Sequence, residues 1–160
     1  MEQKSIEFIV GELLCRKNLT ISTTESCTGG MIAARWISYP GISKVYLEGA
    51  ITYSNESKVK RLGVKQETLD KYGAVSEQTA REMAEGIKRV SGSKVSIATT
   101  GIAGPDGGTK EKPVGLVYIG ICIEEKTLIE KCIFNGNRDQ IRVAATEYSL
   151  NMLNNELMNK

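Results

Sequence analysis

The chain has 160 residues, of which 41% are hydrophobic and 25% charged, and these values predict a single globular domain over residues 1–160 with a sizeable core. The 21 basic and 19 acidic side chains leave a net charge of +2, which argues against nucleic acid or an anionic membrane as a partner. No apolar stretch approaches the roughly 20 residues of a membrane-spanning helix, and acidic residues interrupt the apolar N-terminus. We therefore expect a cytoplasmic protein.

Periodicity in the first part of the chain predicts alternating helices and strands. Apolar residues at helical spacing favour a helix over residues 6–18, and the β-branched run 19–26 favours a strand. A second helix is expected over residues 28–38, before a Pro-Gly turn. A strand over residues 44–54 and a short helix over 55–63 complete this part.

The second part of the chain continues the alternation and ends in a hairpin. Ser76 is the expected N-cap of the clearest helix, which the glycine after Ser91 ends. Strands alternating with helices, followed by a hairpin, predict a three-layer α/β/α domain with a mixed, mostly parallel sheet. The expected segments are a helix over 76–92, a strand over 94–101, a glycine-rich loop over 102–115, antiparallel strands over 115–123 and 126–134, and a helix from residue 138.

Three loops follow predicted strands: one at Ser26, one at residues 53–55 and one at residues 100–108. Ligands of open α/β sheets bind beyond the carboxyl ends of the strands. If the three strands are parallel neighbours, these loops converge on one pocket.

The absence of histidine restricts the chemistry of that pocket. It excludes Ser-His-Asp and Cys-His arrangements and histidine-based zinc sites, so acid–base catalysis must use Lys, Tyr, Asp, Glu or Cys. The cysteines at positions 15, 27, 122 and 132 form no C-x-x-C pair, and we expect neither a metal nor a cofactor. Cys15, Cys122 and Cys132 lie in apolar sequence and are expected in the core, with Cys27 as the exception.

The segment TTESCTGG, residues 23–30, allows two interpretations that do not exclude each other. Ser26 can cap the following helix by accepting its free N–H groups, or it can be a nucleophile whose oxyanion those amides stabilise. Gly29 and Gly30 would allow a substrate to approach the backbone closely. Taken alone, Lys58 has the sequence context of a solvated lysine, and Tyr53 that of a strand aromatic packed on the core.

Five segments in order, TTESCTGG, GAITYSNESKVKRLGV, YGAVSEQTAREMAEG, TTGIAGPDGGTKEKPVG and NRDQIR, resemble the CinA C-terminal domain family. This family includes stand-alone nicotinamide mononucleotide amidohydrolases, and the length of the chain resembles that stand-alone form. The resemblance implies hydrolysis of nicotinamide mononucleotide to nicotinic acid mononucleotide and ammonia, in pyridine nucleotide salvage. It also makes a homo-oligomer a reasonable expectation.

The resemblance places the family's nucleophilic serine on Ser26, its tyrosine on Tyr53 and its lysine on Lys58. With no histidine present, a neutral lysine is the plausible base, acting directly or through Tyr53, provided its pKa is lowered. We expect the helix-start amides to hold the oxyanion and the glycine-rich loop to hold the ribose phosphate. The expected substrate-binding residues are Glu25, Cys27, Thr28, Gly29, Gly30, Thr100, Gly101, Ala103, Gly104, Pro105, Gly107 and Gly108.

Two rival hypotheses remain at this point. In the first, Cys27 is the nucleophile, which predicts inactivation by alkylation. In the second, the chain is a non-catalytic nucleotide-binding or regulatory module, which would bind the mononucleotide without releasing ammonia.

Overall fold

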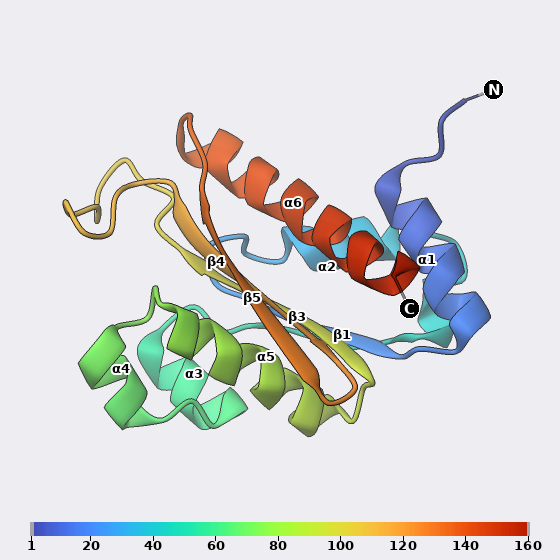
Figure 1. Ribbon diagram of the computed structural model, residues 1–160, viewed down its shortest axis with the longest axis horizontal. Helices are drawn as coiled ribbons and strands as arrows, with labels where there is room; N and C mark the ends of the chain where they lie inside the picture. The colour runs from blue at the N-terminus through green and yellow to red at the C-terminus, as the bar shows by residue number, and fades with distance from the viewer. Residues whose placement is uncertain (1, 160) are drawn as a thin grey trace.

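A computed structural model describes residues 2–159 as a single α/β domain (Figure 1). Helices and strands alternate through the first two thirds of the chain, and a hairpin and a long helix close it, as the sequence predicts. The strands are β1 Ile21–Glu25, β2 Tyr46–Ile51, β3 Val95–Gly101, β4 Leu116–Ile123 and β5 Lys126–Ile133. The helices are α1 Ile6–Lys17, α2 Met31–Ile37, α3 Asn55–Leu62, α4 Gln66–Tyr72, α5 Glu77–Ser91 and α6 Arg138–Met158, with a 3₁₀ turn η1 at Ile42–Lys44.

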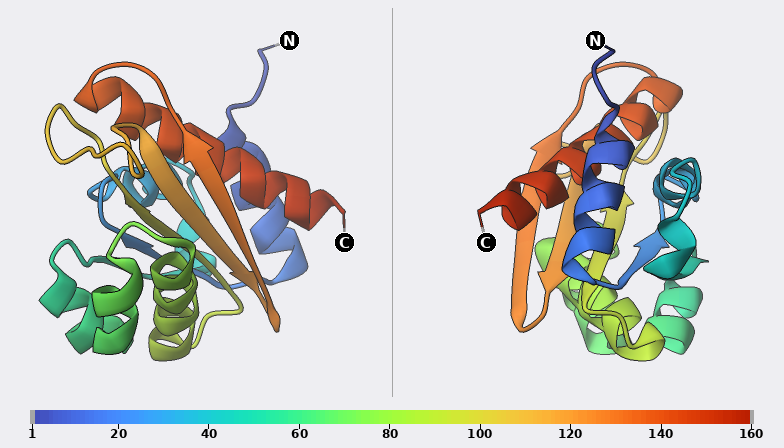
Figure 2. Two further views of the ribbon diagram at one scale, coloured as in Figure 1. Left: turned by 60° about the vertical axis from the view of Figure 1, so that its left-hand side comes forward. Right: turned by 90° about the vertical axis from the view of Figure 1, so that its right-hand side faces the viewer.

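The five strands form one mixed sheet in the order β2-β1-β3-β4-β5. Strand β1 is parallel to both β2 and β3, whereas β4 is antiparallel to β3 and β5. Four of the five strands therefore run in the same direction. Helices α1, α2 and α6 cover one face, and α3, α4 and α5 cover the other (Figures 1 and 2). The predicted three-layer architecture is confirmed.

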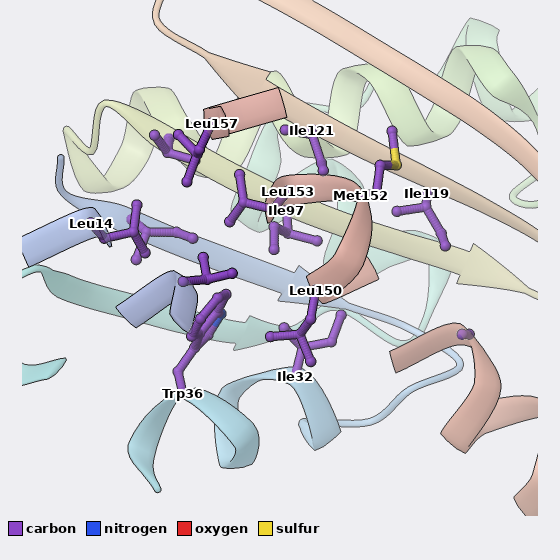
Figure 3. Packing of buried hydrophobic residues seen from close by; sticks show 14 of the residues in the cluster. Leu14, Ile32, Trp36, Ile97, Ile119, Ile121, Leu150, Met152, Leu153 and Leu157 are labelled. Atoms are coloured by element: carbon purple, nitrogen blue, oxygen red, sulfur yellow. The ribbon is translucent and has the colours of Figure 1, made fainter. Parts of the chain in front are cut away.

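Each face of the sheet has its own core. On one side Trp36 of α2, Leu153 of α6 and Ile97 of β3 are fully buried and pack together (Figure 3). Burying a side chain of this size contributes about 1.5–3 kcal/mol. On the other side α5 packs closely on α3, because Gly86 has no Cβ to clash with the Leu62 carbonyl. This close approach fixes the position of α3, the helix that contributes to the candidate site.

The elements differ from the predicted ones in a few places. Helix α2 begins at Met31, three residues later than expected, and α4 was not predicted. Cys27, named as the exception to the core cysteines, is buried, whereas Cys15, expected in the core, is only half-buried. Within residues 2–159, no helix has the length and apolar character needed to cross a membrane.

Candidate active site

The carboxyl ends of β1, β2 and β3 meet at one cavity of about 290 Å³. These three strands are parallel neighbours, so the convergence predicted from their loops is confirmed. The lining residues of the cavity are Ser26, Cys27, Tyr53, Lys58, Ala74, Val75, Thr100, Gly101, Ile102, Ala103, Gly104, Asp106, Gly107 and Arg138.

Ser26 lies at the floor of this cavity, directly after the last residue of β1. Its backbone N–H donates to the Thr99 carbonyl of β3 (3.0 Å), and its own carbonyl accepts from Gly29 (3.1 Å). The chain turns there because Gly29 and Gly30 adopt positive φ values of 57° and 97°, which side chains disfavour. From α6, the Arg142 Nε donates to the Cys27 carbonyl (2.9 Å) and braces the turn.

The N-cap residue of α2 is Gly30, and the free N–H groups of the helix start are satisfied by Glu25, so the expectation that Ser26 caps this helix is wrong. The Glu25 carboxylate accepts from the backbone N–H groups of Ile32 (2.9 Å) and Ala33 (3.1 Å). Thr28 Oγ1 adds a third donor to the same carboxylate (2.6 Å). Because Glu25 satisfies the helix start, the Ser26 hydroxyl is left free to face the cavity.

Lys58 reaches Ser26 from the first turns of α3. The Ser54 side chain caps this helix, accepting from Ser57 N (3.0 Å). The Lys58 side chain extends back across the cap and is 1% exposed, so the expectation of a solvated lysine is wrong. Its Nζ lies 3.4 Å from Ser26 Oγ and donates to the carbonyls of Thr52 (2.9 Å) and Tyr53 (3.0 Å).

The surroundings of Lys58 favour its neutral form. Burial lowers the pKa of the Lys58 ammonium below its ordinary value of 10.5. Among the described residues, no carboxylate lies within 4 Å of Nζ to stabilise a positive charge. A neutral amine has two N–H donors and one lone pair. With both donors on the two carbonyls, the lone pair is the position left for the proton of Ser26.

Tyr53 contributes its carbonyl to this arrangement, and its side chain lies elsewhere. The side chain is 61% exposed, and its hydroxyl lies 3.4 Å from Arg138 Nη2. Lys58 therefore contacts Ser26 directly, and the only Tyr53 atom bonded to Lys58 in the described chain is the backbone oxygen. The expected packing of the Tyr53 ring on the core is wrong.

Some backbone N–H groups around Ser26 have a hydrogen-bond acceptor within the described chain, and others have none. Those of Ser26 and Gly29 are already bonded within the turn. The N–H groups of Cys27, Thr28 and Gly30 have no acceptor among the residues that the structure describes. Of the expected binding residues in this segment, only Cys27 lines the cavity; the side chain of Thr28 is bonded to Glu25 and to Thr99 Oγ1 (2.8 Å).

The glycine-rich loop forms the opposite wall. Most of its expected binding residues line the cavity, whereas Pro105 and Gly108 do not. Thr100 donates its hydroxyl to the Ala74 carbonyl (2.8 Å), which ties the start of the loop to the segment before α5. Five N–H groups of the loop have no acceptor within residues 2–159: those of Ala103, Gly104, Asp106, Gly107 and Gly108.

Arg138 and Asp106 are charged lining residues that the sequence analysis missed. Asn137 caps α6 with a reciprocal bond to Gln140, and this capping box makes Arg138 the first helical residue. Its Nη1 donates to the Gly104 carbonyl (2.7 Å), so the guanidinium links α6 to the glycine-rich loop. The segment NRDQIR contained the signal, but its distance to Ser26 depends on the tertiary fold.

Neither Cys27 nor a cluster of metal ligands offers an alternative chemistry in the part of the chain that the structure describes. Burial raises the pKa of the Cys27 thiol to about 11, which keeps it protonated at neutral pH and unreactive. In the described part of the chain, no three His, Cys, Asp or Glu side chains gather to hold a metal ion.

Comparison with known proteins identifies relatives over almost the whole chain. A competence-damage inducible protein of Clostridium beijerinckii is 61% identical over 152 residues, covering 95% of this chain and 37% of the relative. A protein of the same name from Clostridioides difficile is 58% identical over 155 residues, covering 97% and 37%. The chain thus spans little more than a third of the length of these curated relatives.

Solved structures match over most of both chains. The competence damage-inducible protein A of Klebsiella pneumoniae superposes with a TM-score of 0.93 at 33% identity, covering 96% of this chain and 95% of that one. The competence/damage inducible protein of Agrobacterium tumefaciens has a TM-score of 0.87 at 38% identity, covering 96% and 97%. The family model described as the CinA C-terminal domain matches residues 3–157. The chain therefore belongs to the CinA C-terminal domain family.

Proposed function

We propose that this chain is an amidohydrolase that converts nicotinamide mononucleotide to nicotinic acid mononucleotide and ammonia, with Ser26 as nucleophile and Lys58 as base. The observation that carries the proposal is the buried Lys58 amine, 3.4 Å from the Ser26 hydroxyl at the floor of the cavity. Catalytic hydrogen bonds are often long before substrate binds, so this distance suits a resting nucleophile–base pair.

The reaction proceeds in two halves. Lys58 accepts the Ser26 proton as Oγ attacks the carboxamide carbon, and the resulting ammonium protonates the amide nitrogen, which leaves as ammonia. The remaining ester joins Ser26 to the nicotinoyl group. Water then enters, gives a proton to Lys58 and attacks the ester carbon. Ser26 leaves with that proton, and the product carboxylate is released.

The free amides beside Ser26 supply electrostatic stabilisation for both halves. The N–H groups of Cys27 and Thr28 directly follow the nucleophile and have no acceptor in the described chain. Donors of this kind are suited to the oxyanion of each tetrahedral intermediate, and losing one such donor typically costs about 10²–10³ in rate. Because Glu25 occupies the amides of Ile32 and Ala33, the oxyanion site is confined to the turn.

The opposite wall is suited to the phosphate of the mononucleotide. Successive free N–H groups of a glycine-rich loop form an anion-binding concavity. Arg138, at the first residue of α6, brings a guanidinium and the positive end of the helix to the same wall. Asp106 is the one carboxylate in the cavity lining, and it offers an acceptor for the ribose hydroxyls.

An ammonia-release assay tests this proposal. We expect release from nicotinamide mononucleotide, much slower release from the riboside and slower still from free nicotinamide, because the last two lack the phosphate. Calorimetric binding of the mononucleotide without any ammonia would instead indicate a regulatory nucleotide-binding module and would overturn the proposal. Equal rates on all three amides would overturn the assignment of the phosphate wall.

A further inference from the structure

The glycine-rich loop leaves the sheet and returns to it at one point. The Ile102 N–H donates to the Leu116 carbonyl (2.8 Å), and the Gly115 N–H donates to the Ile102 carbonyl (2.7 Å). Between these bonds, residues 105–111 are exposed without interruption. An exposed segment must be ordered by contacts outside itself, because fixing each residue costs conformational entropy. The contacts that fix this loop therefore decide how its free N–H groups face the cavity.

Lys112, just after the exposed segment, connects the loop to helix α4. Its Nζ donates to the Tyr72 carbonyl (2.5 Å), 40 residues earlier in the chain. Tyr72 is the last residue of α4, where helix carbonyls lack partners within the helix and a positive charge is favoured. Gly73 leaves room for the ammonium, since a Cβ there would lie 3.0 Å from Nζ. One contact thus caps α4 and fixes the end of the loop.

The start of the loop is bonded to the same segment. The Thr100 hydroxyl donates to the Ala74 carbonyl, two residues after Tyr72. Ala74 and the following Val75 line the cavity. Residues 72–74 therefore bond to both ends of the loop whose middle forms the opposite wall.

We propose that Lys112 is a positioning residue for the phosphate wall, because its bond to Tyr72 holds the loop in the conformation that presents its free N–H groups to the cavity. The effect on turnover rests on the proposed deamidation. Lys112 does not line the cavity, so it acts through the loop and not on the substrate. In the described chain, no side chain of residues 105–111 forms a hydrogen bond or ion pair outside the loop that could replace this contact.

A turn at the end of the exposed segment transmits the contact to the glycines of the wall. The Thr109 N–H donates to the Lys112 carbonyl (2.7 Å), and the Lys112 N–H donates to Thr109 Oγ1 (3.0 Å). Fixing Lys112 therefore fixes Thr109, which directly follows Gly107 and Gly108. Gly107 has a φ of 90°, and glycine has no side chain that restricts the backbone to one conformation. Without the anchor, this part of the loop should sample other conformations.

Substitution of Lys112 tests the proposal through KM and kcat. If Lys112→Met leaves the loop in its binding conformation for only about a tenth of the time, the apparent affinity for the mononucleotide falls by the same factor. We therefore expect KM to rise about tenfold and kcat to stay within about twofold of the parent, because bound substrate selects the ordered loop. The riboside, which lacks the phosphate, should be unaffected.

Two further variants separate the specific contact from a general effect on the loop. Lys112→Arg can still donate to the Tyr72 carbonyl and should restore the parental KM. Lys110→Met is the matched control, because Lys110 is exposed and has no bonded partner among the described residues. A parental KM in Lys112→Met, an equal rise in Lys110→Met, or a fall in kcat without a rise in KM overturns the proposal.

Amide hydrogen exchange without substrate distinguishes the loop anchor from the proposed function. The Thr109 N–H is protected by its bond to the Lys112 carbonyl, so it should exchange at least about tenfold faster in Lys112→Met and at the parental rate in Lys110→Met. Parental exchange at Thr109 in Lys112→Met overturns the anchor, whatever the kinetics show. A parent that releases no ammonia overturns the proposed function, whereas faster exchange in Lys112→Met still supports the anchor.

Discussion

The substitution Lys58→Met removes the proposed base and leaves the other residues of the site unchanged. The substitution keeps an unbranched side chain of similar length in the buried channel and removes the amine that lies 3.4 Å from Ser26 Oγ. General-base catalysis contributes about 10²–10⁴ to a rate, and nucleophile and base act as a unit. We therefore expect kcat to fall by about 10³–10⁴-fold. KM should change little, because the hydrogen-bond partners of the Lys58 amine are Ser26, Thr52 and Tyr53, and the proposed phosphate site is formed by other residues.

The pH dependence of the parent follows from the lowered pKa of Lys58. Only the neutral amine can accept a proton, so kcat/KM should rise about tenfold per pH unit below that pKa and level off above it. Burial makes the plateau begin below pH 10.5, the ordinary pKa of lysine. Lys58→Met should lack this rise.

Stability gives a second measurement that is independent of turnover. Because the folded state holds the Lys58 proton less tightly than the unfolded state, the parent's free energy of unfolding should rise with pH between the lowered pKa and 10.5. The rise is about 1.4 kcal/mol for each unit by which the pKa is lowered. Denaturant unfolding at several pH values should show this slope in the parent and not in Lys58→Met.

Ammonia release across the pH range is the assay, with Lys60→Met as the control on the exposed side of α3. The control should keep the parent's rate and pH profile. A Lys58→Met variant that retains most of the activity and the same pH-dependent rise would refute Lys58 as the base.

Three further variants test other parts of the site. Cys27→Ala should stay active, and iodoacetamide should inactivate the parent slowly, because burial raises the Cys27 pKa to about 11; loss of turnover in a folded Cys27→Ala would revive the cysteine mechanism. Glu25→Gln should lose about 1–3 kcal/mol of stability, since an amide cannot accept from the α2 amides through both of its terminal atoms. This loss lowers Tm by about 2–4 °C per kcal/mol, and an unchanged Tm would show that the cap is dispensable. Arg138→Met should raise KM for the mononucleotide at least about tenfold and leave the riboside unaffected; an equal effect on both substrates would contradict a phosphate contact.

Periodicity was sufficient to predict the fold apart from the short helix α4, because most of the other strands and helices have an apolar pattern. The order of three strands, each followed by a small or polar segment, also predicted that the loops at Ser26, at residues 53–55 and at residues 100–108 meet, whereas whether Lys58 reaches Ser26 was left open. The confirmed cavity depends on β1, β2 and β3 being parallel neighbours. Sequence alone left this point open, since the same strands could have been ordered differently.

What the sequence could not predict depends on contacts between distant residues. Caps are usually sought within three residues of a helix start, but Glu25 accepts from Ile32, seven residues along the chain. Arg138 reaches Gly104 across 34 residues, and the burial of Lys58 depends on α5 holding α3 against the sheet. The charged residues next to Lys58 in the sequence favoured a solvated side chain, because the sequence does not show that α5 holds α3 against the sheet.

Ammonia release from nicotinamide mononucleotide by the parent and by Ser26→Ala tests the central claim most directly. Ser26 is 9% exposed and its hydroxyl has Lys58 as its partner, so the substitution removes the nucleophile without disturbing the backbone bond to Thr99. The parent should release ammonia and form nicotinic acid mononucleotide. Ser26→Ala, with the circular dichroism spectrum and Tm of the parent, should be at least about 10⁴-fold slower. Turnover near the parental rate in Ser26→Ala would contradict the account.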